Sequence, residues 1–463
     1  MKLNVKVDEL KEEIIKSSKE LISIRSIQGE AEAGMPFGRE VAKALNCALD
    51  ISSKMGFKTV NLDGYIGYAE YGEGAEYVGV LGHLDVVPEG DGWIYPPYAA
   101  EIHDGKMYGR GTLDDKAPMV AALYGLKAIK DLNLPLSKKV RIIFGTNEES
   151  GCGEMPYYTK REIAPVAGFT PDGQYPIIFA EKGITIFDVV KTLNVKVAGN
   201  TTIKYIKGGQ RANMVPDYCE AAVASEDLNQ VIKSCSEFAA KTGYKISAEI
   251  KDGIAVIKSV GMSAHGSTPH LGKNAIMQMF KFLEVLPLGK CDIYEFINFF
   301  NKYIGFETDG TLFGVGLHDK VSGKLSFTVG TISMDEKKVS VALNLRYPVT
   351  MKYEDMMTPF EKRLEGTGIK VENMMHQAPL YFPSDHPLIK TLQKVYTEQT
   401  GLKADLLAIG GGTYAKEIPN IVAFGPILPG RPDLDHQANE YIGIEDLITN
   451  AKIYAHAIYE LAK

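Results

Sequence analysis

Several features that would place the chain in a common class are missing from it. Only five cysteines occur among 463 residues and none forms a C-x-x-C pair, which argues against both a disulfide framework and a thiolate metal site. No run of eighteen apolar residues is present, and charged residues interrupt the N-terminal segment, so neither a membrane span nor a secretory signal is expected. These absences predict a soluble, cytoplasmic protein.

Clustered positive charge is also missing. The chain has 51 Lys+Arg against 58 Asp+Glu, a net charge of -7, and no basic block, so nucleic acid and membranes are not expected partners. The hydrophobic share of 45% and the charged share of 24% are typical of globular proteins and exclude a disordered chain. A length of 463 residues exceeds that of one typical core, so two domains are expected.

Hydrophobic periodicity indicates how these domains are arranged. Helical patterns at 8–24 and 117–132 alternate with apolar strands at 75–87 and 138–145, which favours a layered α/β domain. Residues 183–382 contain shorter strands interleaved with helices, and the α/β texture returns from 383 to 463. We therefore predict a discontinuous domain of residues 1–182 and 383–463, with a mostly parallel mixed sheet flanked by helices, and an inserted α+β domain at 183–382.

Polar clusters follow several of the predicted elements. Ligands of α/β sheets gather beyond the carboxyl ends of strands, so these clusters are candidates for one shared site. Histidines together with several carboxylates are typical ligands of zinc-type ions, and a shared carboxylate favours a two-metal centre. Each cluster alone also has a structural explanation, as a helix cap or a solvated turn, and the co-occurrence is what favours a site. The clusters are GHLD, TLDDKAP, TNEESG, TPDG and LDHQANE.

The GHLD cluster raises a question of its own. A strand directs alternate side chains to the same side, so His83 and Asp85 are expected to face one way. One of the two can then bind a ligand while the other orients it.

These motifs resemble those of the two-metal peptidases and deacylases, a family that includes aminoacylase, carboxypeptidase G, succinyl-diaminopimelate desuccinylase, carnosinase and the PepV-type dipeptidases. The resemblance extends from about residue 80 to 440, and the large insert makes the chain most similar to the PepV type. It rests on GHLDVVP, YGRGTLDDKAP, GTNEESG, GFTPDGQYPI, GMSAHGSTPHLG and GPILPGRPDLDHQANE.

The resemblance implies a set of metal ligands. In this reading one ion is held by His83 and Asp172, the other by Glu149 and His436, and Asp114 bridges them. Asp85 is then the carboxylate that accepts the second ring N–H of His83 and fixes its tautomer. The bond after the bridging aspartate is often cis in this family. Zinc is the favoured ion, with manganese or cobalt as alternatives.

The resemblance also implies catalytic and substrate-binding roles. Glu148 is the expected general base, and His265 from the insert, acting as a lid, is expected to stabilise the oxyanion. The expected ligands of the substrate's terminal carboxylate are Asn213, Arg346, Gly411 and Gly412, with an arginine fork and backbone N–H groups as a suitable clamp. Arg346 could instead pair on a sheet face, and the glycines could form a plain turn.

Three functions remain open at this point. Asp172, where deacylase members carry Glu, favours a dipeptidase that cleaves unblocked dipeptides, and an insert able to cover the site favours a monomer. The alternatives are an N-acyl amino-acid deacylase such as a desuccinylase, and a metal-binding homologue without turnover. Glu148 speaks against the last, because a binder has no evident need for a base beside its ligands.

Overall fold

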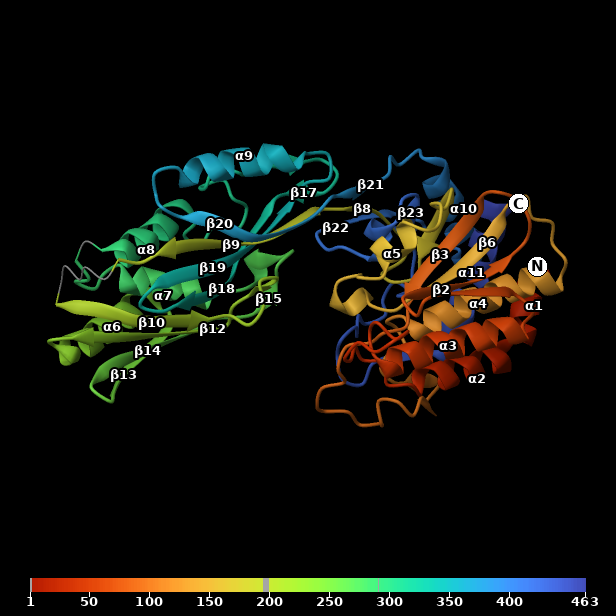
Figure 1. Cartoon of the computed structure of the whole chain (residues 1–463), viewed down its shortest axis with the longest axis horizontal. Coiled ribbons are helices and arrows are strands. Elements are labelled where there is room, and N and C mark those ends of the chain that lie inside the picture. Colours follow the sequence, from red (N-terminus) through yellow and green to blue (C-terminus); the bar gives the residue numbers. More distant parts are fainter. Residues whose placement is uncertain (1, 195–199, 290) are drawn as a thin grey trace. The chain divides into compact units, whose positions relative to one another are not determined.

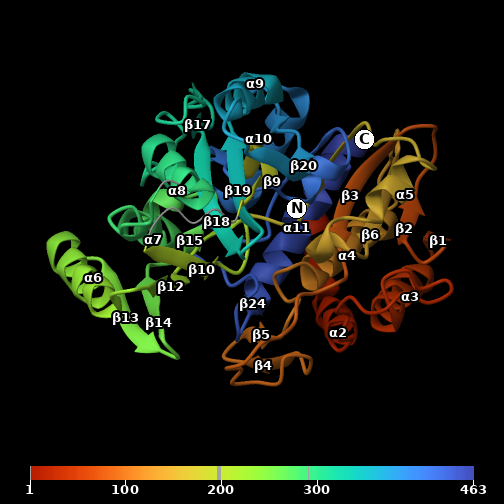
Figure 2. The ribbon, with the colours of Figure 1, turned by 60° about the vertical axis from the view of Figure 1, so that its left-hand side comes forward.

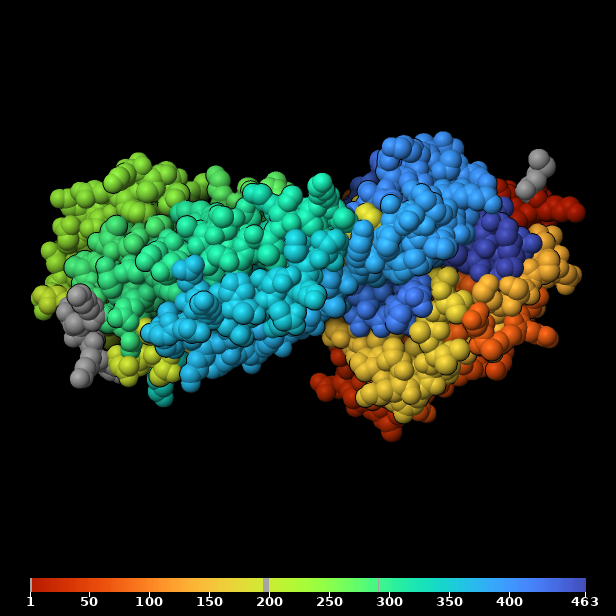
Figure 3. Space-filling view, turned by 90° about the horizontal axis from the view of Figure 1, so that it is seen from above, coloured from red at the N-terminus to blue at the C-terminus, as the bar shows by residue number. Residues whose placement is uncertain are grey.

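The computed structural model describes residues 2–194, 200–289 and 291–463. The chain forms two compact units. The first consists of Met1–Phe179, Phe382–Leu407 and Gly412–Lys463, and the second of Ala180–Tyr381 and Ala408–Gly411. Figure 3 shows this division by colour, because the red to yellow N-terminal part and the blue C-terminal part share one unit while green and cyan segments make up the other.

A mixed sheet forms the centre of the first unit. Its strands follow the order β1-β2-β6-β3-β7-β23-β8 (Figure 1). Parallel pairing joins β6, β3, β7 and β23, whereas β1 and β2 on one side and β8 on the other are antiparallel to their neighbours. The strand bounds are β1 Lys58–Leu62, β2 Ile66–Tyr71, β3 Tyr77–His83, β6 Lys139–Gly145, β7 Ala167–Thr170, β8 Ile177–Glu181 and β23 Ile421–Ala423.

The predicted fold class is confirmed, with one difference in detail. The sheet is mixed and flanked by helices, with parallel pairing among β6, β3, β7 and β23 and antiparallel pairing at β1, β2 and β8. The antiparallel strands β1 and β2 precede the first long crossover helix, so no helical connection forces them to run parallel.

Helices α4 (Lys116–Asp131) and α11 (Ile444–Ala462) pack against this sheet and against each other. Leu447, Ala451, Tyr454 and Ile458 of α11 are fully buried and are spaced as one apolar face of a helix. A Cβ atom on Gly125 of α4 would lie 2.9 Å from the backbone nitrogen of Ala455, so this close helix contact requires glycine.

The remaining elements of the first unit are short strands and outer helices. A small antiparallel sheet has the order β24-β5-β4, and its three strands lie side by side in Figure 2. The described part of the chain holds no helix of the length and apolarity that a bilayer crossing requires. The bounds are α1 Lys2–Glu9, α2 Lys11–Ile22, α3 Arg39–Lys54, α5 Met155–Thr159, α10 Pro387–Thr400, β4 Glu101–His103, β5 Lys106–Tyr108, β22 Leu406–Ile409 and β24 Tyr441–Gly443.

An antiparallel sheet organises the second unit. Its strand order is β13-β14-β12-β10-β18-β19-β9-β20. The bounds are β9 Gly183–Thr192, β10 Thr201–Gly208, β12 Tyr218–Ser225, β13 Lys245–Lys251, β14 Ile254–Val260, β18 Ser326–Met334, β19 Lys338–Tyr347 and β20 Lys370–Gln377, with a separate ribbon of β11 Met214–Val215 and β15 Ala264–His265.

Four helices complete the core of the second unit. Alternate residues of β9 are buried, which is the pattern of a strand with one face on a core. Aromatic side chains such as Phe280, Phe300 and Phe360 fill the space between the sheet and the helices. The helices are α6 Leu228–Thr242, α7 Ala275–Leu283, α8 Asp292–Tyr303 and α9 Tyr353–Leu364.

Candidate metal centre

The parallel strands bring the predicted ligands to one edge of the first sheet. His83 is the last residue of β3 and pairs in register with Gly145, the last residue of β6. Glu148 and Glu149 form a single helical turn directly after β6, and Asp172 follows β7 by two residues. Because parallel strands end at a common edge, residues far apart in the sequence meet there.

The Asp114 carboxylate lies between two histidines. Its Oδ1 is 2.8 Å from Nε2 of His83, and its Oδ2 is 3.0 Å from Nε2 of His436. His436 Nε2 is also 3.0 Å from Oε2 of Glu149. One oxygen directed to each histidine is the arrangement that a bridging carboxylate requires. The peptide bond between Asp114 and Asp115 is cis.

Two overlapping groups of donor atoms have the spacing of metal sites. His83, Asp114 and Glu149 offer ligand atoms within 4.8 Å of one another, and so do His83, Glu148 and Asp172. Glu148, the expected base, therefore lies as close to the ligand atoms as a ligand would. His83 is fully buried, whereas the side chain of His436 is 52% exposed, so the cluster opens to solvent on the His436 side.

The electrostatics of this cluster fit a divalent cation. Burial raises the pKa of Glu148, and Asp172 and Glu149 raise it further while His83 opposes them. Burial would also raise the pKa of Asp114, but hydrogen bonds from the two histidines lower it instead. Oε1 of Glu149 is buried and has no hydrogen-bond partner in the described residues. Crowded carboxylates with an unpartnered buried oxygen are a donor set that bound cations would balance.

The two histidines interact with these negatively charged carboxylates, and their pKa values rise as a result. Hydrogen bonds to Asp114 and Glu149 raise the pKa of His436 to about 11. Burial would lower the pKa of His83, but its hydrogen bonds to Asp114 and Asp85 outweigh burial and raise it. Both imidazoles must lose a proton before they can coordinate a cation, so metal binding at this site would release protons.

Asp85 lies against His83 and against the loop that carries Glu148 and Glu149. Nδ1 of His83 lies 2.9 Å from the main-chain oxygen of Asp85 and 3.5 Å from its Oδ1, so the carbonyl is the nearer acceptor. The Asp85 carboxylate also accepts the backbone N–H groups of Glu148 and Glu149, both at 3.2 Å. The residue thus joins His83 to the neighbouring loop, and its role in fixing the tautomer of His83 stays a prediction.

Two further buried carboxylates, those of Glu440 and Glu154, accept hydrogen bonds from the loops that carry the candidate metal ligands. Neither residue was assigned a role from the sequence. Glu440 accepts backbone N–H groups of Gly111 and Leu113, at 3.0 and 2.8 Å, and pairs with Arg110 at 2.6 Å. Glu154 accepts the backbone N–H of Asn147 at 3.2 Å and the hydroxyl of Tyr414. Glu440 follows His436 by four residues within LDHQANE, and this charged position inside a ligand motif was the available signal.

Replacement of Glu440 by glutamine is expected to destabilise the first unit. The change leaves the buried Arg110 guanidinium without its anion and weakens the cradle of backbone N–H groups. Breaking a buried ion pair costs about 3 kcal/mol or more, and for a unit of this size we expect a drop in Tm of roughly 5 °C or more. Calorimetry of the metal-free chain measures this drop. Glu445→Gln is the matched control, because the Glu445 side chain is 86% exposed and its change should leave Tm within about 1 °C.

The predicted substrate-binding residues of the insert meet within the second unit. Arg346, on β19, donates from Nη1 to the Gly410 carbonyl at 2.8 Å, and its Nη2 lies 3.5 Å from Nε2 of His265. Asn213 accepts the backbone N–H of Gly266 at 2.7 Å, next to the β11–β15 ribbon. Burial lowers the pKa of Arg346 to about 10, and burial together with Arg346 lowers that of His265.

The predicted glycines lie beside this group, but the tightest contact belongs to a neighbour. A Cβ atom on Gly410 would lie 2.8 Å from Cβ of Ser267, whereas one on Gly411 would be in ordinary contact. Gly411 groups with the second unit, and Gly412 is the first residue of the last segment of the first unit. Gly410 therefore allows a close approach to Ser267, and the predicted role of Gly411 and Gly412 stays a prediction.

Comparison with solved structures shows which known proteins share the fold of this chain. Human carnosine dipeptidase 1 has a similar structure, with a TM-score of 0.59 at 17% identity over 99% of this chain and 98% of that chain. The fold is thus one that solved peptidases adopt.

Sequence comparison then shows the family to which the chain belongs. Residues 79–460 match Peptidase family M20/M25/M40, and the chain belongs to this family. It is 41% identical to a Bacillus subtilis (strain 168) protein named "Putative dipeptidase YtjP", over 100% of both chains. It is 36% identical to a Staphylococcus epidermidis protein named "Putative dipeptidase", over 98% of both. The predicted family resemblance is confirmed.

Proposed function

We propose that the chain is a metal-dependent dipeptidase that cleaves unblocked dipeptides. The observation that carries this proposal is the Asp114 carboxylate, with one oxygen on His83 and the other on His436, inside a cluster of carboxylates. Membership of a peptidase family and the dipeptidase names of the 41% and 36% identical relatives support it.

The proposed centre holds two divalent ions. His83 and Asp172 would bind one, Glu149 and His436 the other, and Asp114 would bridge them; zinc is favoured, with manganese or cobalt as alternatives. When bound, such ions supply a Lewis acid for the scissile carbonyl and a lowered pKa for water.

The remaining steps are assigned to side chains of the chain itself. Glu148 would accept the proton of the attacking water and deliver it to the leaving amine. Asp85 would hold Glu148 in place, since its carboxylate accepts the Glu148 N–H. His265 would donate a hydrogen bond from Nε2 to the developing oxyanion, since its Nδ1 faces the Ser267 hydroxyl at 2.7 Å.

Substrate selection is assigned to the second unit. Arg346 is buried and already donates to a backbone carbonyl, which leaves part of its fork for a terminal carboxylate. Asn213, Gly411 and Gly412 would complete the clamp. A carboxylate clamp of this kind would restrict cleavage to short peptides with a free C-terminus, and we propose that the chain acts as a monomer.

A panel of blocked and unblocked substrates tests this function. The purified, metal-loaded chain should hydrolyse Leu-Gly dipeptide but neither N-acetyl-Leu-Gly nor Leu-Gly amide, each compared by kcat/KM. We expect the free dipeptide to be preferred over Leu-Gly amide by roughly 100-fold or more, because the amide leaves the buried Arg346 charge of the clamp unpaired, which costs a few kcal/mol. Hydrolysis of the N-acetylated compound alone would instead identify a deacylase.

A further inference from the structure

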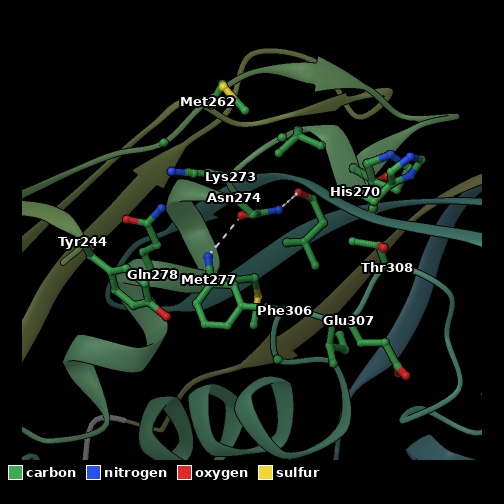
Figure 4. A pocket seen from close by; sticks show the side chains of 18 of the residues that line it. Tyr244, Met262, His270, Lys273, Asn274, Met277, Gln278, Phe306, Glu307 and Thr308 are labelled. Carbon is green, nitrogen blue, oxygen red and sulfur yellow. Dashed lines mark hydrogen bonds between the residues drawn. The ribbon is translucent and has the colours of Figure 1, made fainter. Parts of the chain in front are cut away.

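The second unit contains a cavity that the proposed dipeptidase chemistry does not use. Its volume is about 710 Å³, and all of its lining residues belong to the second unit (Figure 4). They come from the start of β13, the end of β14, the first turns of α7, the loop 304–308 and β18. This volume suits a small organic ligand.

A buried amide lines the cavity without a partner. Gln278 on α7 is only 4% exposed, and its side-chain oxygen has no hydrogen-bond partner within residues 2–194, 200–289 and 291–463. Figure 4 shows the Gln278 amide at the same end of the pocket as Lys273 and Tyr244. Buried amide oxygens in folded proteins are nearly always hydrogen-bonded, so this one points to an N–H or O–H donor on a ligand.

The charge of the lining favours an anion. Lys245 and Lys273 both line the cavity, and neither forms an ion pair with an acidic side chain in the described part of the chain. Glu307 is the acidic residue of the lining; its carboxylate accepts the backbone N–H of Leu312, and in Figure 4 it turns away from the other labelled side chains. In a chain of net charge -7, two lysines without an acidic partner in one lining give the cavity a local positive charge.

The rest of the lining favours an apolar group. The rings of Tyr244 and Phe306 lie 5.5 Å apart and are tilted toward each other. Met277, Phe327 and Val329, each 2% exposed, form an apolar wall. An aromatic or branched aliphatic group can pack between these side chains.

We propose that this cavity binds a small organic carboxylate that carries an N–H or O–H donor and an aromatic or branched apolar group. The ligand's carboxylate pairs with the Lys273 ammonium, and the ligand's N–H or O–H donates to the unpartnered side-chain oxygen of Gln278. Its apolar group packs against Tyr244, Phe306 and Met277. This assignment stands whether or not the chain is a dipeptidase, because none of these side chains belongs to the proposed catalytic set.

Calorimetric titration of the full-length chain tests the chemistry of the ligand. The probes are 3-phenyllactate, whose hydroxyl is the donor, and its neutral isostere 3-phenyllactamide. We expect the carboxylate to bind at least 10-fold more tightly than the amide, and Lys273→Met to abolish this difference. Lys251→Met is the matched control, because Lys251 is an exposed lysine at the far end of β13 that does not line the cavity. Equal binding of both probes, or an unaffected Lys273→Met variant, would overturn the proposal.

Methionine-methyl NMR locates the bound probe. Met262 and Met277 line the cavity, so their methyl signals should shift when 3-phenyllactate is added. Met374 and Met375, exposed on β20 and outside the lining, should not. The titration is repeated with Arg346→Gln, which removes the guanidinium proposed to bind substrate. Binding that disappears in this variant would place the carboxylate at Arg346 and refute the cavity assignment.

Discussion

The Glu148→Gln variant is expected to bind metal normally and to lose most of its turnover. Glutamine keeps the size and the polarity of the side chain but has no carboxylate to accept the proton of water. General bases contribute about 10²- to 10⁴-fold, and we expect kcat for dipeptide hydrolysis to fall by that factor. Steady-state kinetics measure the fall, and elemental analysis measures the bound metal.

The metal content is the decisive part of this experiment, because the Glu148 carboxylate lies within ligand distance of His83 and Asp172. A variant that loses its metal together with its activity would show that Glu148 is a ligand and would refute its assignment as base. Glu73→Gln is the matched control, since Glu73 is an exposed glutamate in the loop between β2 and β3. Its kcat should equal that of the unmodified chain.

The second large effect is expected from Asp114→Asn. Asp114 contacts both histidines, so a neutral amide with one acceptor oxygen removes a bridging ligand from both proposed sites at once. Changes in residues that only orient ligands weaken metal binding by about 10- to 100-fold. We therefore expect this variant to lose affinity by more than 100-fold and to retain less than one ion per chain after dialysis.

Inductively coupled plasma spectrometry of the dialysed protein gives the metal stoichiometry directly. The unmodified chain should retain two ions, which tests the two-metal proposal independently of catalysis. Asp104→Asn serves as the control, because Asp104 is exposed in a turn with a φ of 49°, a conformation that asparagine tolerates. Unchanged metal content in Asp114→Asn would contradict the bridging role.

The local elements of the fold were predictable because their hydrophobic patterns are strong. The helix expected at 117–132 is α4, Lys116–Asp131, and the strand expected at 138–145 contains β6, Lys139–Gly145. Hydrophobic periodicity shows which face of a segment is buried, and this pattern can be read from a few neighbouring residues. The direction of a strand depends on the neighbouring strand with which it pairs, and hydrophobic periodicity does not report this partner. The sequence therefore did not distinguish the antiparallel edge strands β1 and β2 from the parallel strands at the centre of the sheet.

The candidate ligands were also predictable, because His83, Glu149 and His436 each stand in a motif with a distinct residue pattern. Their roles relative to one another were not. Asp85 was expected to accept the ring N–H of His83 with its carboxylate; in the structure its carbonyl is the nearer acceptor, and the carboxylate also accepts backbone N–H groups of the next loop. A sequence does not distinguish two acceptors of one residue, because the path of the backbone decides which of them lies nearer to the donor.

By itself, the sequence determined which residue types reach the strand ends, and with them the family and the chemistry that His and carboxylate ligands permit. Only the tertiary structure decided that Glu440 and Arg110 hold the Asp114 loop and that Gln278 lines a cavity without a partner. The physical reason is distance along the chain. Glu440 is separated by 330 residues from Arg110, and a contact between such positions forms only when packing of the whole unit brings their backbones together.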